Sequence, residues 1–176
     1  MPQTEIELNP VDHITTDALG PPGKRVFYIQ GWKGERVVTL ILEKTQVQAL
    51  AIGVEEFLGD IATKFPELSK VTGEYDEEKM HIHPPLDPLF RVGEIHLGYH
   101  VDSDLAVLIV REVITDDVQV ESATVVRFWC TRAQLRSMSL WGLEVAARGR
   151  AVCPFCNEPI NPEEKHICVK KNGKKH

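Results

Sequence analysis

The residues whose types and spacing could do chemistry stand near the C-terminus. Cys153 and Cys156 form a Cys-x-x-Cys pair, and His166 and Cys168 follow further along the chain. Four nitrogen and sulfur donors are what a structural zinc ion requires. The spacing therefore predicts a Zn²⁺ site made by these four residues.

The expected geometry of this site follows from the spacing. A Cys-x-x-Cys turn directs backbone amides at its sulfurs and can hold two thiolates about 3–4 Å apart on one cation. His166 and Cys168 are two residues apart, so an extended segment projects both to the same side. Four protein ligands leave no open position for water, so we expect a structural ion. A redox Cys-x-x-Cys pair and cysteines in an ordinary loop are the alternatives, and the thioredoxin-like pattern that would favour the redox pair is absent.

The remaining candidate ligands are weaker. His81 and His83 have same-face spacing in an extended segment but show no third ligand, so solvated histidines are the favoured interpretation. His96 and His100 would lie about 13 Å apart on a strand, too far to chelate one ion. Cys130 falls on the apolar side of a strand pattern, which predicts a buried apolar filler. No Gly-x-Ser-x-Gly, His-Glu-x-x-His or Walker motif occurs, so we predict no catalytic residues.

Length and composition favour one domain with a sizeable core. The chain has 176 residues, of which 43% are hydrophobic and 26% charged. Residues 165–176 hold five lysines and no acid, whereas the net charge is −6, so the rest of the chain is strongly acidic. Such a body will not be drawn to nucleic acid or to an anionic membrane. No membrane span, secretory start or disulfide pattern is found, which predicts a cytoplasmic protein.

Alternating runs rich in β-branched and aromatic residues predict strands, with a tight turn at Lys33-Gly34. Apolar residues at three- and four-residue steps predict a helix over Lys44–Phe65, which Pro66 ends. Thr131 and Gln134 fit a capping box that opens a second helix running to about Arg148. The predicted strands cover Ile14–Leu19, Arg25–Trp32, Glu35–Leu42, Phe90–Val101, Leu105–Ile114 and Ala123–Cys130.

The order of these elements predicts the fold class. Strand runs that are followed by helices favour an α+β fold, with mostly antiparallel sheet pairing and two packed helices. We expect this α+β domain to cover residues 1–150 and a zinc knuckle with a basic tail to cover residues 151–176. Residues 66–88 lose all periodicity, and a stretch of this length is usually functional or mobile.

The chain also shows an internal sequence similarity between segments 88 residues apart. Gly34–Leu42 lies over Ser122–Cys130, and Gln46 falls on Gln134. The similarity predicts two half-repeats, 11–65 and 89–149, each a strand-strand-strand-helix unit. The alternative is that any two strand-to-helix junctions look alike at this level.

An ordered set of short motifs resembles the bacterial domain-of-unknown-function family 3090. The resemblance covers nearly the whole chain and implies Cys153, Cys156, His166 and Cys168 as a shared cluster. Asn157 stands where the family commonly has glycine. No activity is implied, although members are encoded beside histidine-phosphatase-like and phosphoinositide-kinase-like proteins. The motifs are Pro22–Gln30, Leu42–Val47, Phe90–Gly93, Gly149-Arg150, Cys153–Cys156, Pro159, Pro162, His166, Cys168 and Asn172-Gly173.

Three functions stay open at this point. The first is a non-enzymatic binding or adaptor protein that contacts another protein through the 66–88 loop and the basic tail. The second is an enzyme or binding domain for an anionic phosphorylated small molecule, against the alternative of ordinary surface charge. The third, nucleic-acid binding through knuckle and tail, is disfavoured by the acidic body. The residues expected at an anion site are Arg25, Lys44, Arg91, Arg111 and Arg127.

Overall fold

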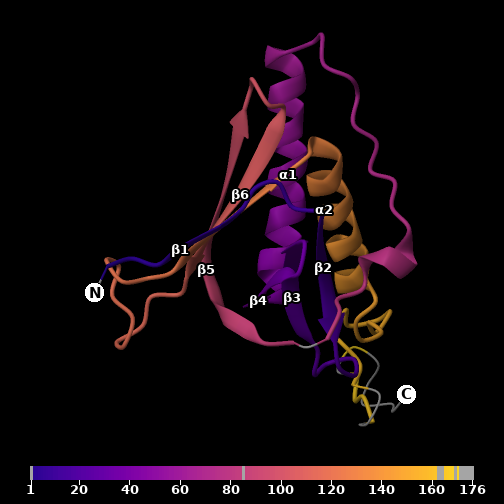
Figure 1. The fold of residues 1–176 in the computed structure, drawn as a ribbon. Helices are drawn as coiled ribbons and strands as arrows, with labels where there is room; N and C mark the ends of the chain where they lie inside the picture. The colour runs from indigo at the N-terminus through magenta and orange to yellow at the C-terminus, as the bar shows by residue number, and fades with distance from the viewer. Residues whose placement is uncertain (1, 85, 162–164, 169, 171–176) are drawn as a thin grey trace.

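Within the described residues, seven β-strands form one sheet, and two α-helices pack side by side on the same side of it (Figure 1). The structure is a computed structural model that describes residues 2–84, 86–161, 165–168 and 170. Across the sheet the strands follow the order β1-β7-β6-β5-β4-β3-β2. The elements are β1 (Glu5–Leu8), β2 (His13–Leu19), β3 (Val26–Lys33), β4 (Arg36–Leu42), α1 (Lys44–Lys64), η1 (Glu77–Met80), β5 (Pro88–His100), β6 (Leu105–Glu112), β7 (Val125–Cys130) and α2 (Arg132–Ala147).

The sheet is mixed, so the expectation of mostly antiparallel pairing is wrong. Strands β2, β3 and β4 form one antiparallel meander, and β5, β6 and β7 form another. The meanders meet through β4 and β5, which run parallel, and β1 lies parallel to β7 at the far edge. Parallel neighbours need a long crossover connection, which α1 and residues 65–87 provide between β4 and β5. The expected α+β architecture with two packed helices is confirmed.

Turns and helix starts form where the sequence signals them. Gly34 adopts a φ of +59° in the tight turn between β3 and β4, a conformation that glycine takes without steric cost. Thr131 and Gln134 form the expected capping box, in which each side chain accepts the backbone N–H of the other residue. α1 begins in a similar way, because the Gln46 side chain accepts the N–H of Glu43.

The two glutamines occupy the same place in the two halves. Gln46 and Gln134 lie at the third position of α1 and α2, and each side-chain amide also donates to a backbone carbonyl of a neighbouring segment. Each helix follows directly on the third strand of its meander. The likeness supports a duplicated strand-strand-strand-helix unit, which stays a prediction.

The sheet curls so that β3 and β7 face each other across the core. A Cβ atom at Gly31 of β3 would lie 2.7 Å from the ring of Phe128 in β7, so this approach requires glycine. In the connection from β1 to β2, the N–H of Val11 donates to a β7 carbonyl and the N–H of Asp12 donates to a β3 carbonyl. These bonds join the two sides of the curl.

The core lies between the curled sheet and the two helices. Leu108, Phe128 and Ile29 of the sheet and Trp141 and Leu135 of α2 are almost completely buried. Full burial of one such side chain contributes about 1.5–3 kcal/mol. No described residue after Ala146 belongs to this core cluster, so the body does not depend on the C-terminal segment for its packing.

The aperiodic segment 66–88 runs along α2 and β2 instead of standing free (Figure 1). Arg136 and Ser137 of α2 donate to its backbone carbonyls. Thr15 of β2 donates to a carbonyl of the segment, and the buried Asp17 accepts one of its N–H groups. Neighbouring polar side chains therefore hold this segment, which explains why it shows no apolar period of its own.

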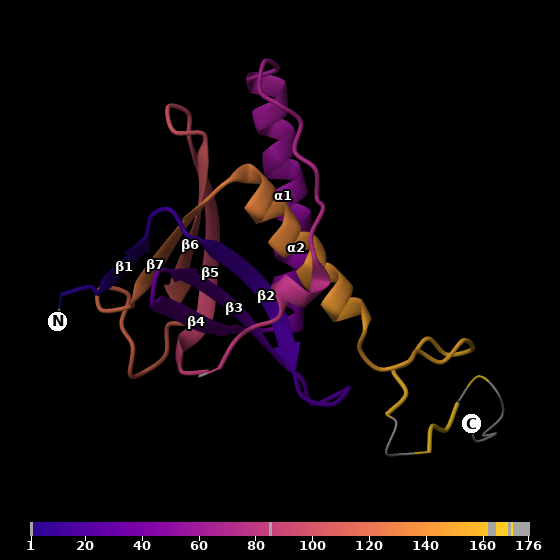
Figure 2. The same cartoon turned by 45° about the vertical axis from the view of Figure 1, so that its right-hand side comes forward.

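Beyond α2 the chain leaves the body and forms a separate small unit (Figure 2). We call residues 151–168 the C-terminal module. Of the basic tail, Lys165 and Lys170 belong to the described residues, whereas 171–176 lie outside them, as does Pro162. Strand β1 was not predicted, because its four residues are too few to show a period. Among the described helices, none has the length and apolar character needed to cross a bilayer.

Candidate functional site

Three thiols and one imidazole meet in the C-terminal module. The ligand atoms of Cys153, Cys156, His166 and Cys168 all lie within 4.8 Å of one another, and the Cys156 sulfur is 3.3 Å from Nε2 of His166. In a tetrahedral zinc site with bonds of about 2.0–2.3 Å, ligand atoms are about 3.5–3.8 Å apart. Small movements therefore suffice to bring all four onto one ion. These are the four residues that the sequence predicts as ligands.

A short backbone hairpin positions the first two thiols. The N–H of Cys153 donates to the carbonyl of Glu158, and the N–H of Asn157 donates to the carbonyl of Cys153, each at 2.9 Å. An antiparallel bridge between Val152 and Pro159 closes the hairpin. Asn157 adopts a φ of +63°, where asparagine is tolerated far better than most residues. The left-handed residue of the turn is thus Asn157, the position at which the sequence resemblance leads us to expect glycine.

The pKa values of the cluster thiols are perturbed differently from that of Cys130, the thiol in the body. A hydrogen bond from the backbone N–H of Cys156 lowers the pKa of Cys153 to about 6. At Cys156 the largest single effect, a backbone hydrogen bond at Glu158, acts to lower the pKa, but burial and the neighbouring thiols together outweigh it, so the pKa is raised. Burial raises the pKa of Cys130 to about 12. A thiolate ligand is therefore favoured at Cys153 and strongly disfavoured at Cys130.

The other sequence candidates have ordinary partners. His81 contacts the buried Asp17 carboxylate through Nδ1 at 3.2 Å, and the ring of His83 packs edge-on against Trp32. Cys130 is completely buried, as its apolar surroundings predict. The described residues contain only one metal-compatible Cys, His or carboxylate cluster, the one in the module.

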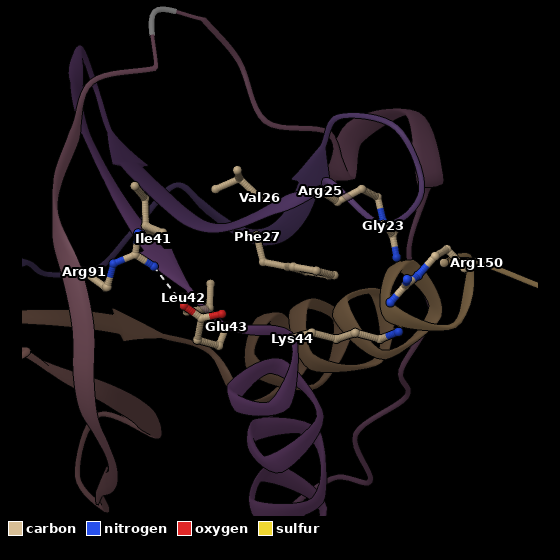
Figure 3. Close-up of a pocket in the computed structure, with 11 residues that line it drawn as sticks. Gly23, Arg25, Val26, Phe27, Ile41, Leu42, Glu43, Lys44, Arg91 and Arg150 are labelled. Carbon is tan, nitrogen blue, oxygen red and sulfur yellow. Dashed lines mark hydrogen bonds and ion pairs between the residues drawn. The ribbon is translucent and has the colours of Figure 1, made fainter. Parts of the chain in front are cut away.

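A second site lies where β3, β4 and α1 meet the end of α2 (Figure 3). This pocket has a volume of about 250 Å³ and is lined by four cationic side chains and a single carboxylate. Phe27, Ile41 and Leu42 add an apolar wall. We call it the basic pocket. Its charged lining residues are Arg25, Lys44, Arg91, Arg150 and Glu43.

The charges of the basic pocket fall into two groups (Figure 3). Arg91 pairs with the only carboxylate, Glu43, at 2.8 Å. On the other side, the nitrogens of Arg25, Lys44 and Arg150 point toward one another with no acidic lining residue between them. Three cations without a carboxylate repel one another and favour a bound anion.

Arg25 is the fixed member of this group of three. Its Nη1 donates to the carbonyl of Val145 at 2.8 Å, in the last turn of α2, and its guanidinium lies over the ring of Phe27. Burial lowers the pKa of Arg25, and the nearby Asp17 partly offsets the effect. The side chain remains a cation at neutral pH, held rigid and partly shielded from water.

Two glycines leave room for the cations. A Cβ at Gly149 would lie 3.1 Å from Arg25 Nη2 and 3.2 Å from Lys44 Nζ, so both nitrogens approach the same point. A Cβ at Gly23 would lie 3.0 Å from Cδ of Arg150. Gly23 also has a φ of +87°, which favours glycine. The basic pocket thus has glycine at the two positions where the backbone comes closest to these cationic side chains.

The basic pocket brings together three of the five residues predicted for an anion site, namely Arg25, Lys44 and Arg91. Arg111 and Arg127 do not line it, because β6 and β7 are separated from β4 by β5. Arg127 is instead paired with Glu5 of β1 at 3.2 Å.

Sequence reasoning missed Arg150 as a pocket residue. It follows the second helix, and no periodicity or motif marks it as a binding residue. The family resemblance could have identified Arg150, because four of the motifs that carry the resemblance contribute residues to the pocket lining. These segments are Pro22–Gln30, Leu42–Val47, Phe90–Gly93 and Gly149-Arg150.

Comparison with known proteins identifies a family. A family model described as a protein of unknown function (DUF3090) matches residues 6–168. The match includes the basic pocket and all four residues of the thiol–imidazole cluster. No curated protein and no solved structure matches the chain.

Proposed function

Because this chain belongs to the DUF3090 family, whose description assigns no activity, we propose its function from its sites: a non-enzymatic binding or adaptor protein with one structural Zn²⁺. The observation that carries the proposal is the cluster of Cys153, Cys156, His166 and Cys168, whose ligand atoms lie within 4.8 Å of one another. Three sulfurs and one nitrogen match the donors that zinc prefers, and four protein ligands fill a tetrahedral shell. A filled shell suits a structural ion and leaves no position for a substrate.

The surroundings of the cluster support a role in contacting another protein. Val152, Phe155 and Ile167 are 53%, 45% and 59% exposed, although all three are apolar. Apolar side chains that surround a rigid metal site offer a contact surface to a partner. Free thiols with metal-ligand spacing suit a reducing compartment, so we place the protein in the cytoplasm.

Metal analysis of freshly purified, tag-free protein tests the structural zinc. We expect one zinc per chain in the wild type and loss of zinc in Cys168→Ser, which removes one ligand. Cys130→Ala is the matched control, because it removes a thiol that lies outside the cluster, and it should retain zinc. Absence of zinc from the wild type, or full zinc in Cys168→Ser, would contradict the assignment.

Affinity capture tests the adaptor role. A stoichiometric partner should be recovered with wild-type protein and lost with Ile167→Ser, which removes an exposed apolar side chain but no ligand. Zinc content should stay at one per chain in that variant. A partner that binds Ile167→Ser as well as wild type would exclude this surface.

A second candidate function is binding of an anionic phosphorylated small molecule in the basic pocket. The observation that favours it is the approach of Arg25 and Lys44 to one point above Gly149, with Arg150 on the same side of the pocket. Charge-assisted hydrogen bonds from Lys and Arg to phosphate oxygens are among the stronger polar contacts in proteins. A volume of about 250 Å³ suits a small monophosphate ester whose body lies on the apolar wall.

Titration calorimetry with inorganic phosphate and with phenyl phosphate tests this second function. Lys44→Gln should weaken binding, whereas Arg111→Gln, which removes the same charge outside the pocket, should not. Gly149→Ala should also weaken binding, because its methyl group would fill the space between the two nitrogens. Gly53→Ala is its control, since a Cβ there meets nothing within 4 Å. Equal phosphate affinity of Lys44→Gln and Arg111→Gln would exclude the basic pocket as the phosphate-binding site.

A further inference from the structure

Two residues of the basic pocket belong to the connection that leads into the thiol–imidazole cluster. Gly149 and Arg150 are the two residues between Arg148, whose N–H still bonds to the last turn of α2, and Ala151, the first residue of the C-terminal module. Both of these connecting residues line the basic pocket. The pocket and the cluster are therefore joined by a two-residue bridge.

The bridge is held at both ends. On the body side, Arg148 pairs with Glu77 and with Glu144. On the module side, the carbonyl of Ala151 accepts the N–H of Ile160 at 2.7 Å, and the hairpin continues into Cys153. The Arg150 backbone is thus attached directly to the first hydrogen-bonded residue of this hairpin.

We infer that metal loading of the Cys153–Cys156–His166–Cys168 cluster sets the affinity of the basic pocket for a phosphate group, and that Arg150 is the link. This inference rests on the anion-binding function proposed above. It makes the site a composite one, with Arg25 and Lys44 supplied by the body and Arg150 placed by the metal-bound module.

The physical reason is the different stability of the two sides. Arg25 is fixed by the α2 carbonyls, and Lys44 is the first residue of a long helix, so neither needs the metal. The hairpin that leads from Arg150 has few bonds of its own among the described residues, and metal coordination is what closes such small units. Without the ion, Arg150 gains conformational freedom that binding must remove again. The metal-free pocket then offers two fixed cations in place of three.

The experiment compares phosphate binding by zinc-loaded protein and by protein stripped with a strong chelator under reducing conditions. Calorimetry with inorganic phosphate should show affinity falling about tenfold on stripping, the value of one charge-assisted hydrogen bond. Arg150→Gln in the loaded state should lose a similar factor. Near-UV circular dichroism of Trp141 and its neighbours checks that the body stays folded after stripping, because the core contains no residue of the module.

The stripped Arg150→Gln variant decides whether Arg150 is the link. If it is, removing zinc from this variant should change phosphate affinity by less than about twofold, because the contact is already lost. Equal affinity of loaded and stripped wild type would overturn the coupling and leave the anion site in place. The coupling through Arg150 would also be overturned if removing zinc lowered the phosphate affinity of Arg150→Gln as much as that of the wild type. No phosphate binding by any form would overturn the anion site itself, and with it this inference.

Discussion

The body of the protein and its C-terminal module bury different kinds of side chain. In the body, large side chains such as Phe128 and Trp141 are almost fully buried between a curled sheet and two helices. In the module, the apolar side chains of Val152 and Ile167 are more than half exposed, while Cys153 and Cys168 are buried. Burial in the body removes apolar surface from water, whereas burial in the module encloses the sulfurs of a metal-compatible cluster.

This contrast shows how a small segment can be ordered without a core. An apolar cluster of the size seen in the body requires many residues, and the module does not have them. Coordination by four ligands concentrates stabilisation in a few contacts. The module should therefore respond to metal and thiol chemistry, and the body to changes in packing.

The strongest test of the contrast is removal of the metal. Stripping zinc should unfold the module alone, because structural zinc contributes on the order of 10 kcal/mol in small units. Hydrogen exchange followed by mass spectrometry should show loss of protection in residues 151–161, with the peptides of α1 and β6 unchanged. Readdition of zinc should restore protection. Equal loss of protection in α1 would mean that the two regions are not independent.

The reciprocal test removes packing from the body. Phe128→Ala deletes a fully buried ring between β7 and β3, and such changes cost about 3–5 kcal/mol. We expect the free energy of unfolding of the body, measured by urea denaturation, to fall by this amount. The folded variant should keep its full zinc content. Loss of zinc from the folded variant would contradict the separation of the two regions.

A smaller effect should come from the polar contacts that hold loops to the body. Arg132 is 8% exposed and donates two hydrogen bonds to the Asp104 carboxylate, at 2.7 and 3.0 Å, and one to the carbonyl of Ser69. Arg132→Met should cost about 1.5–3 kcal/mol, because hydrogen bonds to charged groups are lost. Urea unfolding at pH 7 measures this, with zinc content as the control that should not change.

The same contact makes a prediction about pH. The hydrogen bond from Arg132 lowers the pKa of Asp104 below its ordinary value. A carboxylate with a depressed native pKa stabilises the fold above the ordinary aspartate pKa of about 3.9, and the effect disappears as pH falls through the native pKa. The stability difference between wild type and Asp104→Asn should therefore shrink between pH 7 and pH 2. A difference that stays constant over that range would exclude the ion pair as its source.

Local features were predictable where one short signal decides the structure. The turn at Gly34, the capping box at Thr131 and the ligand spacing from Cys153 to Cys168 depend on few residues, and each is found in the expected place. The parallel pairing of β4 with β5 was not predictable from strand patterns, because it depends on where a long connection returns. The order of segment 66–88 depends on donors supplied by α2 and β2 and on isolated apolar anchors such as Met80, which form no period that the sequence could reveal.

The basic pocket shows the same limit. Arg25, Lys44 and Arg91 were candidates for an anion site on the sheet face, but so were Arg111 and Arg127, which lie elsewhere. Which arginines converge depends on strand order in the sheet. The cluster of cysteines and histidine needed no such information, because all of its members lie in one short stretch of chain.

Among the residues that the structure describes, two non-glycine residues are left-handed, one in each region, and they provide the finest test. Asp104 has a φ of +48° and its carboxylate accepts from Tyr99 and Arg132, whereas Asn157 has a φ of +63° and no hydrogen bond from its side chain among those described. Asn157→Gly should therefore change zinc affinity by no more than about twofold, because glycine adopts the same backbone conformation without strain.

Asn157→Val is the matched variant, and its β-branched side chain should weaken zinc binding about tenfold, since this conformation costs such residues about 1–2 kcal/mol. Competition with a chromogenic zinc chelator measures both affinities. In the body, Asp104→Gly should be destabilising, because its side-chain bonds are lost although its φ is kept. A strong loss of zinc in Asn157→Gly would show that the asparagine side chain, and not the backbone turn, holds the metal loop.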